Sequence, residues 1–254
     1  SGSGTQSLIA NNEIIHSSAN GQTYGIYSYY SKAYLLHNSI YLNSTSSSSM
    51  YGMYISNTST GYGPMTIKNN ILSIHHPASY PTSGYPIYFQ NGGVYLTQAY
   101  KIIDGNNYYS TGNYVGYAGN NITSLAAMQN VTLQDTHSIS QNPGFLNPTF
   151  NLHTSGSAML VKPLSLLSVD MDGKARTMIT NMGCYHDFLP LALDVKLESI
   201  LSPTSLTPGV TTPISVNITN FGSTNIDSVN IYWRINGGAA QAYNWTNGPL
   251  TLFN

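Results

Sequence analysis

The sequence predicts an all-β protein, in which a solenoid of short parallel strands runs to about residue 190 and a β-sandwich follows it. Two kinds of short segment alternate along the first half of the chain, one introduced by Asn and one ending in Tyr. Longer stretches of alternating polar and apolar residues begin after Leu191. Helical periodicity is confined to residues 122–129, where Thr123 and Ser124 can cap a short helix. We therefore expect two domains, residues 1–190 and residues 191–254.

Each pair of segments predicts one coil of the solenoid. The segments introduced by Asn are 11–14, 37–40, 69–72 and 106–109, and those ending in Tyr are 25–27, 52–54 and 86–88. Asn tolerates the left-handed backbone of a turn better than other residues that carry a side chain. Asn side chains at one place in successive coils can also hydrogen-bond from coil to coil. The sequence thus predicts a ladder of Asn side chains beside strands that alternate between interior and surface.

These coils resemble the right-handed parallel β-helix repeats of pectate-lyase-like proteins. Residues 106–145 and 152–158 are similar to the closing segment of secreted β-helix proteins of Bacteroidetes-type bacteria, as are residues 170–176 and 181–186. That family usually has Asp, Ala and Glu where this chain has Asn181, Cys184 and His186. The resemblance implies a right-handed parallel β-helix for residues 1–190, and the three departures weaken any metal site there.

Residues 191–254 have the pattern of a β-sandwich. Strands are expected at 195–200, 214–219 and 229–235, with turns at Pro203 and at Gly237-Gly238. The succession resembles the CARDB-type Ig-like domain, an adhesion-associated module of bacterial surface proteins, whose turn Asn220-Phe221-Gly222 matches. A complete sandwich needs roughly seven strands, and only about four fit. We expect an incomplete Ig-like β-sandwich that continues in a longer polypeptide or is completed at its exposed edge by a partner or by self-association.

Charged side chains are scarce, since 7% of residues are Asp, Glu, Lys or Arg and the net charge is −1. The chain has no basic run to neutralise phosphates, which excludes nucleic acid as a partner. It also has no apolar run of the roughly 20 residues that span a bilayer. The single cysteine, Cys184, excludes an internal disulfide. A surface of Ser, Thr, Asn, Gly and Tyr is typical of exported proteins, so we expect an extracellular or cell-surface protein and a piece of a longer precursor.

Catalytic groups are sparse in the predicted coils. A polysaccharide lyase or hydrolase needs clustered carboxylates, or Lys or Arg with a calcium ion. The charged side chains of residues 1–150 are Glu13, Lys32, Lys68, Lys101, Asp104 and Asp135. The three lysines could line one face, but we expect them to be solvated surface residues. The pattern favours a non-catalytic protein.

Tyrosine is the most unusual component, with 21 residues in the chain. Stacked coils would align some of these rings into a ladder on one face. We predict that Tyr27, Tyr29, Tyr54 and Tyr88 form a ligand-binding surface. Two roles fit such a ladder equally well: it can stack on sugar rings or on another protein, or it can only stabilise neighbouring coils.

A calcium site is the main metal hypothesis. Asp170-x-Asp172-Gly173 has the two carboxylates and the glycine turn that open a calcium loop, but no further acidic residue follows at the spacing that a full loop needs. The competing interpretation is a hydrogen-bonded turn in which Arg176 pairs with an Asp. We expect His75 and His76 to face solvent in their loop, and His153 to be a buried, hydrogen-bonded residue.

Cys184 has His186 and Asp187 close to it in the sequence, as a nucleophile or a metal ligand would require. We expect a buried small hydrophobic residue instead.

Together these observations predict a non-catalytic extracellular segment of a larger bacterial surface or secreted protein, structural or adhesive in role and able to bind a polysaccharide or another surface protein. The alternative is the C-terminal part of a polysaccharide lyase or glycoside hydrolase of the β-helix type, with its catalytic coils upstream of Ser1.

Overall fold

The computed structural model describes residues 6–56, 65–90, 96, 101–154, 159–177, 179–187, 193–203, 205, 210–220, 222 and 224–251. The chain divides into two compact units, unit 1 (Ser1–Phe188) and unit 2 (Leu189–Asn254). The boundary expected at residues 190 and 191 lies outside the described residues. Each unit is considered by itself.

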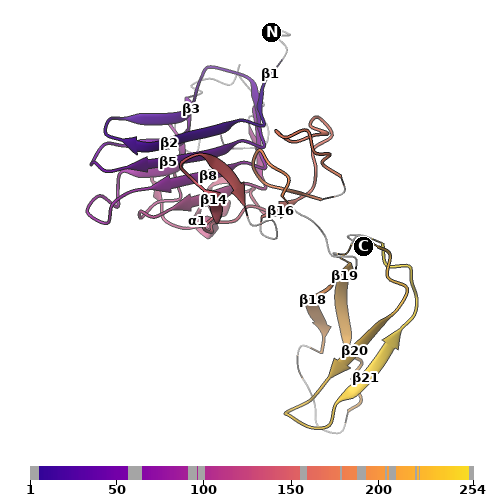
Figure 1. Cartoon of the computed structure of the whole chain (residues 1–254). Coiled ribbons are helices and arrows are strands. Elements are labelled where there is room, and N and C mark those ends of the chain that lie inside the picture. The colour runs from indigo at the N-terminus through magenta and orange to yellow at the C-terminus, as the bar shows by residue number, and fades with distance from the viewer. Residues whose placement is uncertain are drawn as a thin grey trace. The chain divides into compact units, whose positions relative to one another are not determined.

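Unit 1 contains three parallel sheets, which we call A, B and C (Figure 1). Sheet A consists of β1 (Ser7–Ala10), β4 (Ala33–Leu36), β7 (Met65–Lys68) and β10 (Lys101–Asp104). Sheet B consists of β2 (Glu13–Ala19), β5 (Ser39–Ser44), β8 (Ile71–His75) and β11 (Asn107–Ser110). Sheet C consists of β3 (Thr23–Tyr29), β6 (Met50–Ser56), β9 (Gly84–Phe89) and β12 (Gly116–Ala118), with β13 (Asn121–Ile122) antiparallel to β12.

Successive strands visit sheets A, B and C in turn, so three consecutive strands make one coil. Coil 1 is β1–β3, coil 2 is β4–β6, coil 3 is β7–β9 and coil 4 is β10–β12. Each coil pairs in parallel register with the next; Ile14 lies opposite Ile40, for example, and Ile40 opposite Leu72. The prediction of an all-β chain with parallel sheets is therefore confirmed.

An apolar interior lies between the three sheets. Leu35, Met53, Ile67, Leu72 and Ile87 are fully buried there. The short helix α1 (Leu125–Thr132) closes this interior after coil 4, since Met128 is fully buried in the same cluster. The Ser124 side chain caps α1 by accepting a hydrogen bond from the Ala127 N–H. The predicted helix is confirmed, three residues further along the chain.

A ladder of Asn side chains runs through unit 1 beside the interior, as predicted. The Oδ1 atoms of Asn38, Asn70 and Asn106 each accept hydrogen bonds from both the backbone N–H and the side-chain amide of the ladder Asn in the preceding coil, at 2.8–3.2 Å. The ladder begins at Asn12. It ends where the Asn106 N–H donates to the Ser138 hydroxyl, at 2.9 Å. These bonds join the coils without charges.

The left-handed turn residue is the one before each ladder Asn; it is an Asn, as expected, in coils 1 and 3 but not in coils 2 and 4. Asn11, His37, Asn69 and Gly105 have φ values between 51° and 67°. Comparison of the segments in the sequence placed Asn106 opposite Asn69. In the structure Asn107 pairs with Ile71, so Asn106 lies opposite Asn70, one residue further along. Two adjacent residues thus divide the roles of turn and ladder, although the side chains of the turn residues His37 and Asn69 also contact each other from coil to coil, at 2.9 Å.

The remainder of unit 1 folds back over sheet B. It contains β14 (Phe145–Asn147), β15 (Asn151–Thr154), β16 (Leu160–Val161) and β17 (Thr180–Asn181), in two antiparallel pairs. We call residues 159–187 the C-terminal segment. Figure 1 shows β14 in front of the strands of sheet B. Leu152 and Cys184 are buried against Tyr41, and the Cys184 N–H donates to the Ser39 hydroxyl at 3.0 Å.

Two groups expected at the surface are buried. Lys101 is only 3% exposed and lies 5.9 Å from the centre of the Phe89 ring, and burial lowers its pKa to about 8. His76 is also buried, against Gly84, while His75 is half-buried between the rings of Tyr41 and Tyr109. The prediction of solvated side chains at Lys101 and at the two histidines was wrong, because neighbouring coils cover residues that a single strand would expose.

Unit 2 contains two antiparallel hairpins. These are β18 (Val195–Ser202) with β19 (Ser215–Asn220), and β20 (Val229–Trp233) with β21 (Gln241–Trp245). The buried Asn220 side chain accepts the Gly222 N–H at 2.7 Å and donates to the carbonyls of Thr224 and Leu250. Phe221, between them in the expected turn, lies outside the described residues. The strands occur where the sequence predicted them, with β21 in addition.

Candidate functional site

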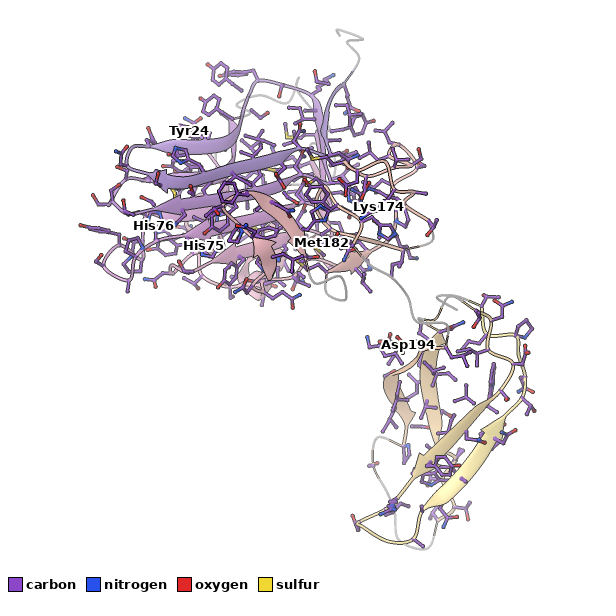
Figure 2. All side chains as sticks on the ribbon, viewed as in Figure 1. Tyr24, His75, His76, Lys174, Met182 and Asp194 are labelled. Carbon is purple, nitrogen blue, oxygen red and sulfur yellow. The ribbon has the colours of Figure 1, made fainter. Side chains whose placement is uncertain are left out.

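Two columns of stacked tyrosine rings cover the outer side of sheet C. We call these eight residues the tyrosine face: Tyr24, Tyr51, Tyr85 and Tyr114 in one column, and Tyr27, Tyr54, Tyr88 and Tyr117 in the other. Within each column the ring centres of neighbouring coils are 4.3–5.7 Å apart and the ring planes lie within 14° of parallel. Tyr24 is labelled in Figure 2. The predicted tyrosine ladder is therefore confirmed as a structural feature.

The two columns touch edge to face. The ring centres of Tyr24 and Tyr27 are 5.2 Å apart with planes at 84°, and the same contact recurs between Tyr51 and Tyr54 and between Tyr85 and Tyr88. Offset-stacked and edge-to-face pairs are the favourable arrangements of aromatic rings, each worth about 0.5–1.5 kcal/mol beyond burial. The face is therefore a rigid surface, since every ring in it is held by its neighbours.

Each coil contributes one Tyr-x-x-Tyr motif, whose two tyrosines would point to opposite sides of a regular strand. The strand pairing of coils 1 and 2 passes from Tyr24 to Ile26 without Gly25, so the chain is irregular there. A Cβ atom on Gly25 would lie 2.6 Å from the carbonyl oxygen of Gly52, and a Cβ atom on Gly52 would lie even closer to the carbonyl oxygen of Pro86. Glycine permits this close approach, and both tyrosines can then face outward while Ile26 stays inside.

Of the four residues predicted to bind a ligand, Tyr27, Tyr54 and Tyr88 lie in one column of the tyrosine face. Tyr29 lies beside Tyr27, with 6.3 Å between ring centres, and is opposite Ser56 in coil 2. The structure thus brings the four together. Whether they bind a ligand stays a prediction. Tyr85 was not predicted, although the four Tyr-x-x-Tyr motifs of the sequence could have revealed it.

The tyrosine face is electrically neutral. The strands β3, β6, β9 and β12 contain no Asp, Glu, Lys or Arg. Burial raises the pKa of Tyr88 to about 12, and the neighbouring Tyr117, Tyr51, Tyr54 and Tyr85 raise it further in the same direction. Burial also raises the pKa of Tyr24, Tyr54 and Tyr85. The hydroxyl groups of these four tyrosines therefore remain protonated at neutral pH and can both donate and accept hydrogen bonds.

Alkaline titration should reveal these shifted tyrosines. The pKa of Tyr88 is about 12 in the folded chain against 10.0 for an ordinary tyrosine, so the neutral ring favours folding. This contribution is complete below pH 10 and is lost as the pH rises to 12. Tyrosinate absorbance should therefore appear in two phases, the second coinciding with loss of the circular dichroism signal. A single phase near pH 10 with the fold intact would contradict the stacked columns.

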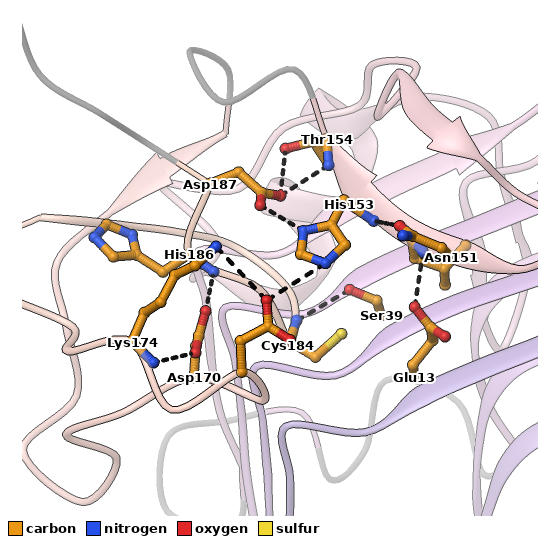
Figure 3. A network of polar contacts seen from close by, with 12 residues as sticks. Glu13, Ser39, Asn151, His153, Thr154, Asp170, Lys174, Cys184, His186 and Asp187 are labelled. Atoms are coloured by element: carbon orange, nitrogen blue, oxygen red, sulfur yellow. Dashed lines mark hydrogen bonds and ion pairs between the residues drawn. The ribbon is translucent and has the colours of Figure 1, made fainter.

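A second cluster of polar side chains lies between β15 and the C-terminal segment (Figure 3). The His153 ring stacks on Tyr185 with 3.7 Å between centres. Its Nδ1 atom lies 2.6 Å from Asp187 and its Nε2 atom 3.5 Å from Asp172. Asp187 also accepts the Thr154 N–H at 2.8 Å. His153 is half-buried and hydrogen-bonded, close to expectation, and the cluster ties β15 to the end of unit 1.

The two aspartates proposed for calcium take different partners. Both carboxylate oxygens of Asp170 accept backbone N–H groups, from Lys174 and His186, each at 2.7 Å. Asp172 faces His153 and the Lys174 ammonium, 3.6 Å away. Within the described part of the chain no group of three His, Cys, Asp or Glu side chains could hold a metal ion. Whether Asp170 and Asp172 bind calcium stays a prediction.

Arg176 and Cys184, which the sequence singled out, are both buried side chains. Arg176 is buried and donates to the carbonyls of Gly183 and Cys184 and to the Asn11 side chain, at 2.9–3.1 Å. Among the described residues it forms no ion pair with an Asp, so that part of the prediction was wrong. Cys184 is fully buried, as expected, and burial raises its pKa to about 12, which keeps it a thiol.

No helix in the described residues is long and apolar enough to cross a membrane. Comparison of the chain with protein-family models, with curated proteins and with solved structures finds no match.

Proposed function

We propose that this chain is a non-catalytic segment of an extracellular protein, in which unit 1 is a right-handed parallel β-helix that binds a neutral, linear polysaccharide along its tyrosine face. Unit 2 is proposed to be an incomplete Ig-like β-sandwich of the CARDB type. The regular succession of strands through sheets A, B and C supports the β-helix, because parallel strands joined in this order form a coil.

The observation that carries the proposal is the neutral and repetitive surface of sheet C. The C-terminal segment packs on sheet B, where it buries Tyr41. On the tyrosine face Tyr27 is 52% exposed, Tyr51 is only 9% exposed, and the other six rings are half-buried. Tyrosine rings, each with a hydroxyl group, repeat once per coil along two columns, with 4.3–5.7 Å between neighbouring ring centres. A linear polymer of hydroxyl-bearing rings can follow such columns and exchange hydrogen bonds with each coil. The absence of charge from these strands favours a neutral polymer over an acidic one.

Stacking on sugar rings is concentrated at one end of the tyrosine face. Inside the columns each ring presents its faces to the tyrosines of adjacent coils, so only the ring edge and the hydroxyl group are available. Tyr27 and Tyr29, in coil 1, are 52% and 60% exposed. These two rings therefore supply the apolar platform, and Tyr54 and Tyr88 supply hydroxyl groups.

Non-catalytic action is supported by the positions of the carboxylates. Asp170, Asp172 and Asp187 are engaged with backbone N–H groups or with His153. The Glu13 carboxylate accepts the Leu152 N–H at 2.7 Å. Acid and base catalysis needs a pair of carboxylates that flank a bound sugar. The three aspartates lie in the cluster around His153 and Glu13 lies on sheet B, so none of the four is on sheet C.

Unit 2 supports an adhesive or self-associating role. Large apolar side chains of its strands are exposed, including Leu197, Ile200 and Tyr232, each more than half exposed. Such a surface, beside unpaired strand edges, promotes association with another copy or another protein.

The binding proposal is tested by calorimetric titration of the protein with cellohexaose, a neutral linear oligosaccharide, and with oligogalacturonate as the acidic counterpart. The double variant Tyr54→Phe and Tyr88→Phe keeps both stacked rings and removes two hydroxyl groups. We expect it to bind cellohexaose about tenfold or more weakly, since each hydrogen bond contributes about 1 kcal/mol.

The matched control is Tyr34→Phe, the same change at a half-buried tyrosine of sheet A. It should leave affinity unchanged. Equal affinity in the double variant, or a preference for oligogalacturonate, would contradict the proposal. New reducing ends or unsaturated uronate in the same mixtures would favour the alternative, a polysaccharide lyase or glycoside hydrolase.

A further inference from the structure

The two ends of the coil stack in unit 1 differ. After coil 4 the interior is closed by α1 and β13, and the Asn ladder finishes on Ser138, whose hydroxyl group is itself bound to Asp135. At coil 1 none of the described residues plays an equivalent part. Coil 1 therefore presents, at this end of the stack, the same kind of apolar side chains and strand edges that each later coil uses to bind the coil before it.

The apolar interior is open at coil 1. Ile9 is 36% exposed, whereas the residues that follow it in register, Leu35, Ile67 and Ile103, are at most 1% exposed. Ile14 is likewise only partly buried, whereas its register partner Ile40 is fully buried. These residues occupy equivalent sites of successive coils, so the difference in their exposure comes from their position in the stack. The described residues therefore give coil 1 less apolar cover than they give the later coils.

The hydrogen-bonding groups of coil 1 are open in the same direction. The Oδ1 atoms of Asn38, Asn70 and Asn106 each accept two hydrogen bonds from the coil before. The Oδ1 atom of Asn12 accepts none from the described residues, and Asn12 is exposed. The strands β1, β2 and β3 are edge strands of sheets A, B and C. Edge strands are commonly blunted by Lys, Pro or inward charges, but Glu13 is the only charged residue in these three.

From these observations we infer that the coil 1 end of unit 1 is a docking surface for a further β-coil, parallel to β1–β3, which carries an Asn that donates its backbone N–H and side-chain amide to Asn12. The interface between successive coils of this chain is the pattern for that contact, so the docked coil continues an established interface. Tyrosines in a Tyr-x-x-Tyr motif would extend both columns, and the ring stacked on Tyr27 would then replace Tyr27 as the exposed ring at the open end of the tyrosine face.

A second copy of the chain is a poorer occupant. Docking head to tail would require coil 4 of one copy to meet coil 1 of another, and α1, β13 and Ser138 occupy that end. Docking head to head would bring two Asn12 acceptors together, with no donor between them. The polarity of the ladder therefore selects a partner that supplies donors.

The test uses a peptide with the sequence of residues 33–56, which is coil 2 of this chain and contains the required Asn38 and Tyr51-x-x-Tyr54. The control peptide carries Asn38→Asp, which is equal in size but replaces the donating amide by a carboxylate facing the Asn12 oxygen. We expect the first peptide to bind and to slow amide hydrogen exchange in β1, β2 and β3, and the control to bind at least tenfold more weakly. Equal binding of the two peptides would overturn the inference.

Because a free peptide can fail to fold, a second measurement uses a covalent version. A further copy of residues 33–64 is joined ahead of Gln6, with Asn or Asp at the ladder position. The Asn version should unfold several degrees above the Asp version and show protected β1–β3 amides. Equal melting temperatures, or β1–β3 amides already protected in the unmodified chain because it forms a dimer, would contradict the proposed docking.

Discussion

Replacing Asn70 by alanine is expected to lower the free energy of unfolding by about 4 kcal/mol, the largest effect of any single substitution considered. Asn70 is fully buried in the middle of the ladder. Its oxygen accepts the Asn38 N–H at 2.9 Å, and its amide donates to the Leu35 carbonyl at 2.9 Å. Alanine leaves both backbone groups buried without a partner, and each orphan costs about 1–3 kcal/mol.

Asn12→Ala provides the matched control, because it makes the same chemical change at the open end of the ladder. Asn12 is exposed, its oxygen accepts nothing from the described residues, and water can replace its donors. We expect a loss below about 1 kcal/mol for this variant. Urea denaturation followed by circular dichroism gives both values. Equal losses at Asn70 and Asn12 would show that the ladder does not hold the coils together.

Arg176→Met is expected to cost about 3 kcal/mol and to release the C-terminal segment from the coils, since bonds to a charged donor contribute about 1.5–3 kcal/mol each. Burial lowers the pKa of Arg176 to about 10, so the guanidinium is still charged at neutral pH. It joins Asn11 to Gly183 and Cys184, residues far apart in the sequence. Methionine fills much of the volume but leaves these oxygens without donors.

Limited proteolysis and amide hydrogen exchange over residues 159–187 measure this release directly. Arg176→Lys keeps a charge but loses the planar fork, and should show an intermediate effect. If Arg176→Met opened coils 1–4 as readily as the C-terminal segment, or left both unchanged, the assigned role of Arg176 would be wrong.

The features that the sequence predicted are local and repeated. The Asn ladder and the tyrosine columns recur once per coil, so each could be recognised by comparing one segment with the next. Their details depend on register. Comparison of the segments aligned Asn106 one residue out of place, and it did not include Tyr85.

What the sequence did not predict depends on contacts between distant residues. Lys101 and His76 look like loop or strand-end residues in isolation, and neighbouring coils bury them. Arg176 was expected to pair with a nearby Asp, but its partners include Asn11, which is separated from it by 165 residues. No periodicity reports such a contact, because the C-terminal segment folds back over the coils only once.

The central claim, that the tyrosine face binds a neutral linear polysaccharide, is tested most directly by calorimetric titration with cello-oligosaccharides of increasing length. We predict that affinity increases with each added sugar until the oligosaccharide spans the four stacked coils and is constant thereafter, and that the Tyr54→Phe and Tyr88→Phe double variant loses this dependence. Affinity that is undetectable at every length, or independent of length, would contradict the proposed function.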